Sequence, residues 1–129
     1  MKHATWIPAA LAIFALQAPA MAQEDGSDIV LPLSAQTCDL PTAPARIPET
    51  PSYDDLVAAK DRVSEFQTSL ASYRECLDGA GDPELMTEGN RIALNQAHNY
   101  SVEMEERVAE QFNVAVRDYK ARQDAEGEQ

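Results

Sequence analysis

The sequence predicts an all-α protein: an antiparallel two-helix hairpin with an N-terminal proline-rich extended segment tied back by a disulfide. Three observations predict this fold. Two long stretches place apolar residues at alternating steps of three and four, the spacing of one face of a helix. Prolines crowd between Cys38 and Pro51, where they prevent helix formation and favour extended polyproline II structure. Two cysteines, Cys38 and Cys76, stand at the far ends of these regions.

Residues 1–22 have the pattern of a secretory signal peptide. Lys2 gives a basic head, an apolar run follows from 4 to 16, and Ala20-Met21-Ala22 offers a cleavage site. The run is too short for a comfortable membrane span of about 20 residues. We therefore expect a periplasmic or secreted protein with no stable membrane insertion after cleavage; the alternative is an uncleaved anchor. Residues 23–129 would remain, enough for one small domain.

Residues 23–51 form a leader and the proline-rich extended segment. The leader is acidic at first and then briefly apolar from Ile29 to Leu33.

The first helix is expected over residues 52–78. Its seam is Leu56, Ala59, Val63, Phe66, Leu70, Tyr73 and Leu77, at heptad spacing. Ser52 and Asp55 have the spacing of a capping box at its start. Gly79 can take the left-handed conformation that ends many helices.

The second helix is expected from about 84 to 123, and residues 125–129 are expected to be a disordered acidic tail. Asp82-Pro83 is a typical helix start, although Gly89-Asn90 could delay it. If the hairpin is in register from a short loop, the part of this helix after about Glu110 overhangs the start of the first helix. The proline segment, the leader or a second copy of the chain could pack there.

An intrachain bridge between Cys38 and Cys76 is expected because export places both cysteines in an oxidising compartment. The geometry allows it. The helix from Tyr53 to Cys76 advances about 35 Å, and an extended segment from Cys38 to Ser52 covers about 43 Å. A bridge between chains and two free thiols are the alternatives.

Val102, Ala109 and Val116 form a second apolar line on the second helix, at strict heptad spacing. This line is about a quarter-turn from the main stripe, so the first helix alone would not cover it. It is the candidate interaction face, and a homodimer built as a four-helix bundle is one way to cover it.

No catalytic, cofactor-binding or metal site is expected. Glu103, Glu105, Glu106 and Glu110 have no histidine three residues later, as di-metal bundles require, and predict a solvated acidic face. The two cysteines and His98 lack the spacing of metal ligands. The net charge of −12 should repel nucleic acid and anionic membranes.

Parts of the chain resemble a group of small exported proteobacterial proteins. The resemblance lies in Cys38, Pro41, Pro44 and Ile47-Pro48, in Tyr73 to Leu77, and in helix positions between Asn99 and Lys120. It implies the same architecture and export, and no activity or site. More distantly, the hairpin is similar to helices of periplasmic chaperones and adaptors, a likeness of fold alone.

These features favour a non-enzymatic exported envelope protein that binds or scaffolds an unknown protein partner. The alternative is a small inhibitor or stress protein that acts on cationic hydrolases such as lysozyme, which the acidity and the cysteine pair suggest.

Overall fold

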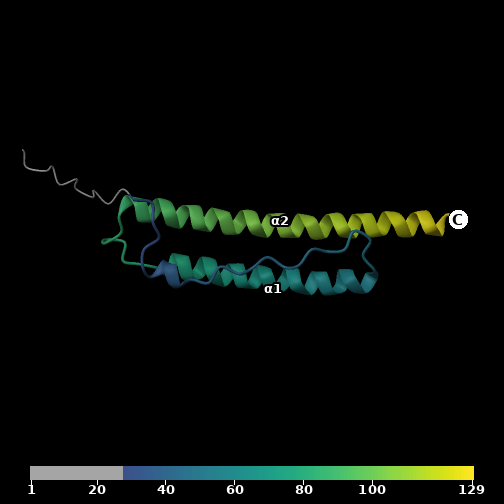
Figure 1. Ribbon diagram of the computed structural model, residues 1–129, viewed down its shortest axis with the longest axis horizontal. Coiled ribbons are helices and arrows are strands. Elements are labelled where there is room, and N and C mark those ends of the chain that lie inside the picture. Colours follow the sequence, from purple (N-terminus) through teal and green to yellow (C-terminus); the bar gives the residue numbers. More distant parts are fainter. Residues whose placement is uncertain (1–27) are drawn as a thin grey trace, which may run out of the picture.

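The computed structural model describes residues 28–129, and the expected signal peptide and the start of the leader, before Asp28, lie outside them. A short 3-10 helix, η1 (Ala35–Thr37), precedes two long helices, α1 (Tyr53–Asp78) and α2 (Glu88–Gly127). The all-α expectation is confirmed, with no strand among residues 28–129. Figure 1 shows α1 and α2 side by side, with the C-terminus at the end of the molecule where α1 begins.

The start of α1 agrees with the capping box read from the sequence. The Asp55 backbone N–H donates to Ser52 Oγ at 3.1 Å, and the Ser52 N–H donates back to Asp55 Oδ2 at 2.9 Å. The end of α1 differs in detail. Gly79 keeps a right-handed conformation (φ −84°), and the positive φ of +89° falls on Gly81. The left-handed residue therefore lies at Gly81, two positions after the glycine cap expected at Gly79.

The second helix begins later than 84, as the pair Gly89-Asn90 allowed, and its expected end at about 123 was wrong. Residues 82–85 form a turn instead of a first helical turn, because the Leu85 N–H donates to the Asp82 carbonyl at 3.0 Å. The helix begins after Thr87, which makes a capping box with Asn90. It then continues to Gly127, so most of the expected disordered tail is helical. No proline or glycine interrupts residues 123–126, so nothing local ends the helix before Gly127.

The core lies between the two helices and is built on the seam of α1. Leu56, Ala59, Phe66, Leu70, Tyr73 and Leu77 are all buried. Phe66 and Leu70 pack with Val108 in the middle of the molecule. Tyr73 and Leu77 pack with Ala80 and with Ala35 of η1 near the loop. The heptad spacing of the first helix therefore identified its buried face.

The register of the helices differs from the expected one. Arg122 Nη2 donates to the carbonyl of Pro51, just before α1, at 3.0 Å. The part of α2 up to Arg122 therefore lies alongside α1, and the overhang expected from about Glu110 is confined to the last turns of α2, which extend past the start of α1 (Figure 1). The first turns of α2 also extend beyond the end of α1 (Figure 1). The leader lies there, and Asn90 Nδ2 donates to the Val30 carbonyl at 2.8 Å. The register differs from the expected one because the loop from 79 to 87 is longer than the sequence suggested.

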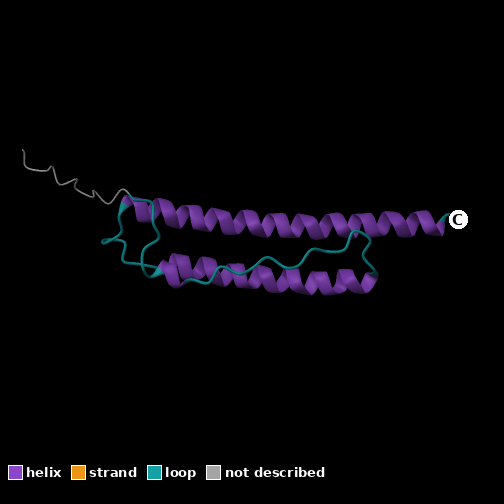
Figure 2. Cartoon of the chain, in the orientation of Figure 1, coloured by secondary structure: helices purple, strands orange, loops and turns teal. Residues whose placement is uncertain are grey.

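Residues 38–51, which we call the strap, run back along the two helices as an extended segment (Figure 2). Cys38, Pro41, Pro44 and Ile47 are half-buried, and the residues between them are exposed. A period of three is that of a polyproline II helix, which presents every third side chain on the same side. The strap thus packs one edge onto the hairpin and turns the other two to solvent.

Candidate interaction surface

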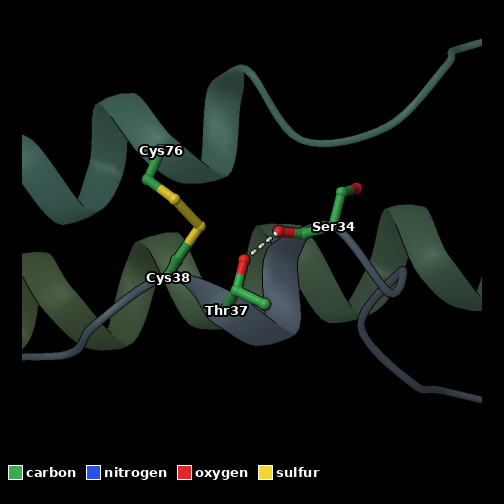
Figure 3. The surroundings of a disulfide bond; sticks show 4 residues. All are labelled: Ser34, Thr37, Cys38 and Cys76. Atoms are coloured by element: carbon green, nitrogen blue, oxygen red, sulfur yellow. Dashed lines mark hydrogen bonds between the residues drawn. A yellow bond between two sulfur atoms is a disulfide. The ribbon is translucent and has the colours of Figure 1, made fainter.

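The Cys38–Cys76 disulfide joins the start of the strap to the last turn of α1, with the two Cα atoms 5.8 Å apart. The expected intrachain bridge is confirmed. Local contacts position Cys38. Its N–H donates to the Ala35 carbonyl at 3.1 Å, and Thr37 Oγ1 donates to the Ser34 carbonyl at 3.0 Å (Figure 3). The bridge fixes η1 against the end of α1, where Ala35 completes the core.

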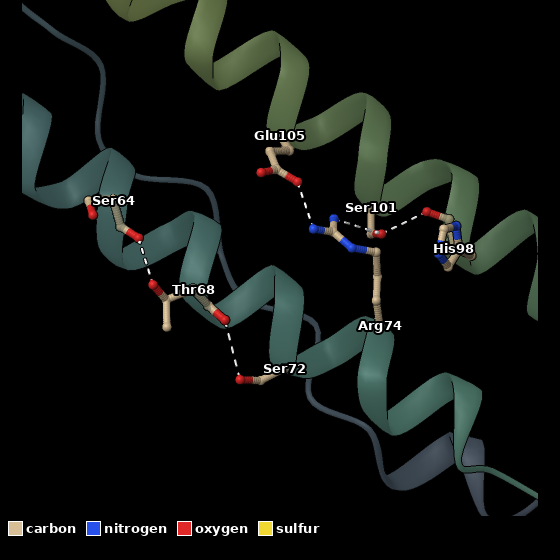
Figure 4. Close-up of polar contacts among 7 residues, drawn as sticks. All are labelled: Ser64, Thr68, Ser72, Arg74, His98, Ser101 and Glu105. Carbon is tan, nitrogen blue, oxygen red and sulfur yellow. Dashed lines mark hydrogen bonds and ion pairs between the residues drawn. The ribbon is translucent and has the colours of Figure 1, made fainter.

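A polar link crosses from the C-terminal part of α1 to α2 (Figure 4). Arg74 of α1 forms an ion pair with Glu105 of α2 at 2.8 Å, and its guanidinium also donates to Ser101 Oγ at 3.4 Å. Ser101 is fully buried, and its hydroxyl donates to the His98 carbonyl at 2.7 Å. No buried side-chain nitrogen or oxygen of this link lacks a hydrogen-bond partner, so the link favours one register of the two helices.

The four glutamates expected to form one acidic face have different surroundings. Glu105 belongs to the link with Arg74, and Glu110 pairs with Arg117 at 2.9 Å on the exposed surface. Glu103 and Glu106 are exposed. Among residues 28–129, no group of three or more histidine, cysteine, aspartate or glutamate side chains is placed to hold a metal ion.

Val102, Ala109 and Val116, the expected interaction face, are each half-buried. At about 100° per residue, they lie on the flank of α2 opposite to Gln111 and Asp118, which line the strap's groove. The strap therefore does not cover this line. Its partial burial means that the hairpin shields much of it without a second molecule.

Two side chains of α1 have shifted pKa values. The pKa of Asp55 is lowered from its usual 3.8, chiefly by the backbone N–H of Ser52 and then by the Ser52 hydroxyl, because both favour the carboxylate. Burial raises the pKa of Tyr73 above its usual 10.0. Both groups have structural roles, Asp55 in the helix cap and Tyr73 in the core.

The open grooves on the surface of the described chain include two that lie beside exposed apolar side chains. One runs between the strap and α2; its lining includes Ile47, Pro48, Val114 and the carboxylates of Glu110 and Asp118. The other, of about 430 Å³, lies at the loop end between the end of α1 and the start of α2. Large apolar side chains stand exposed at that end, led by Leu33 and Leu85. Such grooves can accept apolar side chains of another molecule.

The sequence reasoning missed the strap's period, the Arg74–Glu105 link and the exposed loop end. The period was present as Cys38, Pro41, Pro44 and Ile47, at steps of three. The link had no sequence signal, because it depends on the register of the two helices. The loop end was hidden because the leader and the loop 79–87 are far apart in the chain.

Comparison with protein-family models, curated proteins and solved structures finds no match to this chain. Within residues 28–129, neither long helix has a stretch apolar enough to cross a membrane.

Proposed function

We propose that this chain is an exported, non-enzymatic protein of the cell envelope that binds or scaffolds other proteins. In this proposal it acts as a stiff antiparallel hairpin, held straight by the proline-rich segment that the disulfide ties back. The resemblance to small exported proteobacterial proteins supports export, as does the pattern of residues 1–22.

The observation that carries the proposal is that α1, α2 and the strap are tied to one another near both ends of α1. The Cys38–Cys76 bridge joins the strap to the last turn of α1, Arg74 joins the same end of α1 to Glu105 of α2, and Arg122 of α2 reaches the Pro51 carbonyl at the start of α1. Alpha-helix α2, with 40 residues, is about 60 Å long. A braced rod of this length keeps exposed side chains at fixed spacings, which suits it to presenting a surface to a partner.

The test is site-specific photo-crosslinking in the native cells, with the crosslinker at the exposed positions Tyr100, Val114 and Leu85. We expect discrete crosslinked products in the envelope fraction, each with the same partner identified by mass spectrometry. The same material should begin at Gln23. The absence of a product at all three positions, or a chain that retains Met1 in the cytoplasm, would contradict the proposal.

A second candidate is an inhibitor or stress protein that acts on cationic hydrolases such as lysozyme. The groove between the strap and α2 favours it, because its lining holds three carboxylates, Glu49, Glu110 and Asp118, against the single basic residue Arg46, beside Ile47 and Val114. Carboxylates around an apolar groove suit a lysine or arginine side chain of a basic enzyme. A lysozyme activity assay separates this candidate from the first, since inhibition should disappear when Glu110 and Asp118 are both replaced by glutamine.

A further inference from the structure

The loop end of the hairpin exposes large apolar side chains from two separate segments. Leu33 of the leader is 83% exposed, and Leu85 of the loop is 80% exposed. They are brought to the same end because the leader packs against the loop. A methyl group on Gly81 would lie 3.8 Å from Pro32 Cβ, 3.6 Å from Ser34 Oγ and 3.2 Å from Met86 Cε. Large apolar side chains exposed at one end of a molecule can form part of a contact site for another molecule.

A groove opens beside these leucines. Its apolar lining comes from Leu77, Ala80, Pro83, Met86 and Leu94, and its volume is about 430 Å³. That is enough space for a large apolar side chain of another molecule. We call Leu33, Leu85 and the lining of this groove the tip surface.

The rim of the tip surface is acidic. Asp78 lines the groove, and Asp82, Glu84 and Glu88 are exposed in or next to the loop that contributes Pro83 and Met86 to it. Arg91 is the one basic residue of the sequence between 78 and 92. It is engaged by Glu88 at 3.1 Å and by the Met86 carbonyl at 3.0 Å. The tip therefore combines an apolar centre with unbalanced negative charge.

We propose that the tip surface is a docking site for a cationic amphipathic segment of a partner protein. A leucine-like side chain of the segment enters the groove, its neighbours cover Leu33 and Leu85, and its lysines or arginines face Asp78, Asp82 and Glu84. This inference rests on the proposed function and deepens it, because it names the surface and the chemistry of the partner.

Charge complementarity favours a cationic segment over two other molecules that could cover an apolar tip, namely a second copy of the chain and a membrane surface. A second copy of the chain would bring an equally acidic rim against the first, which is unfavourable at close range. An anionic membrane surface would repel the same carboxylates. A basic segment is attracted to these carboxylates. The apolar centre adds buried apolar surface area, which an interaction between charges alone would not provide.

The test uses a short amphipathic helical peptide of leucine and lysine and measures its binding to the full mature chain by isothermal titration calorimetry. The tip variant is Leu33→Ser with Leu85→Ser. The matched control is Val57→Ser with Tyr100→Ser, which removes exposed apolar groups of α1 and α2 away from the tip. Circular dichroism melts of each variant establish that it is folded, and all four positions are exposed, so little loss of stability is expected.

We expect the tip variant to bind the peptide about tenfold or more weakly, and the control variant to bind within about twofold of wild type. Replacing the peptide's lysines by glutamates should abolish binding, and replacing its leucines by serines should weaken it to the same level for wild type and tip variant.

Equal binding by wild type and tip variant would overturn the tip assignment, and so would failure of wild type to bind the peptide. Tip-dependent binding to phosphatidylcholine vesicles, or self-association lost in the tip variant by sedimentation equilibrium, would replace the cationic segment by a membrane or by a second copy. None of these results decides the proposed function, because crosslinking at Tyr100 and Val114 reports a partner independently of the tip.

Discussion

Arg74 and Glu105 meet across the two helices at 2.8 Å, and their side chains are only 18% and 28% exposed. This ion pair is partly buried between α1 and α2. A one-turn slip of either helix would move the two charges about 5.4 Å apart along the axis. The pair therefore favours one register of two helices whose apolar seams could slide.

Removing the arginine of this pair should lower the stability of the fold. Arg74→Ala leaves Glu105 without its partner in a partly desolvated place, so we expect a loss of about 1–2 kcal/mol in the free energy of unfolding. The measurement is urea denaturation followed by circular dichroism. Arg117→Ala is the matched control, because the Arg117–Glu110 pair is 62% exposed on both sides and should contribute little. Equal effects of the two substitutions would contradict a register role for Arg74.

Removal of the disulfide should destabilise the hairpin more than any single surface change. The bridge spans 38 residues of sequence, and the chain-entropy model gives about 4 kcal/mol for a loop of that length. We expect the double variant Cys38→Ser with Cys76→Ser to unfold at a clearly lower urea concentration than the oxidised wild type. Reduced wild type should match the variant. An unchanged midpoint would mean that the leader and the strap are held in place without the bridge.

The three-residue period of the strap predicts that neighbouring positions respond differently to the same charge. Pro44→Asp places a carboxylate on the half-buried edge, and we expect a loss of about 2 kcal/mol in stability. Ala43→Asp places it on an exposed edge and should change stability little. Thermal melts of both variants measure this difference. If the two variants melt together, the strap does not pack on the hairpin with the period described.

The cap of α1 should make stability depend on acid. The folded pKa of Asp55 lies below the usual 3.8, so its stabilising effect is complete above that pH and is lost as the pH falls through the folded pKa. We expect Asp55→Asn to melt below wild type at pH 6 and to approach it near pH 2. Asp54→Asn, in the same first turn, is the control for the helix dipole. A gap between Asp55→Asn and wild type that persists unchanged at pH 2 would contradict the assignment.

Self-association through Val102, Ala109 and Val116 remains a prediction that sedimentation equilibrium can decide. A dimer at micromolar concentration that becomes a monomer in Val102→Glu with Val116→Glu would establish the face. If the wild type is a monomer, we expect the same double variant to be less stable than the wild type. Each glutamate would replace a valine that is half-buried in the folded chain. A monomeric wild type whose double variant keeps its melting temperature would rule out both roles.

The sequence by itself determined the features that depend on local spacing. The heptad seam identified the buried face of α1, Ser52 with Asp55 marked its start, and the reach of the proline segment allowed Cys38 to meet Cys76. Each of these follows from helix or polyproline geometry along one stretch of chain, so no knowledge of distant segments was needed.

Only the tertiary structure decided how the segments meet. Thr87 with Asn90 capped α2 in preference to Asp82-Pro83, and the longer loop shifted the register. That shift brought Arg74 opposite Glu105 and left the first turns of α2 to be covered by the leader. It also placed Leu33 and Leu85 at one exposed end. These outcomes depend on side-chain packing between residues far apart in the chain, and repeating apolar seams fit several registers about equally well, so local spacing alone could not select among them.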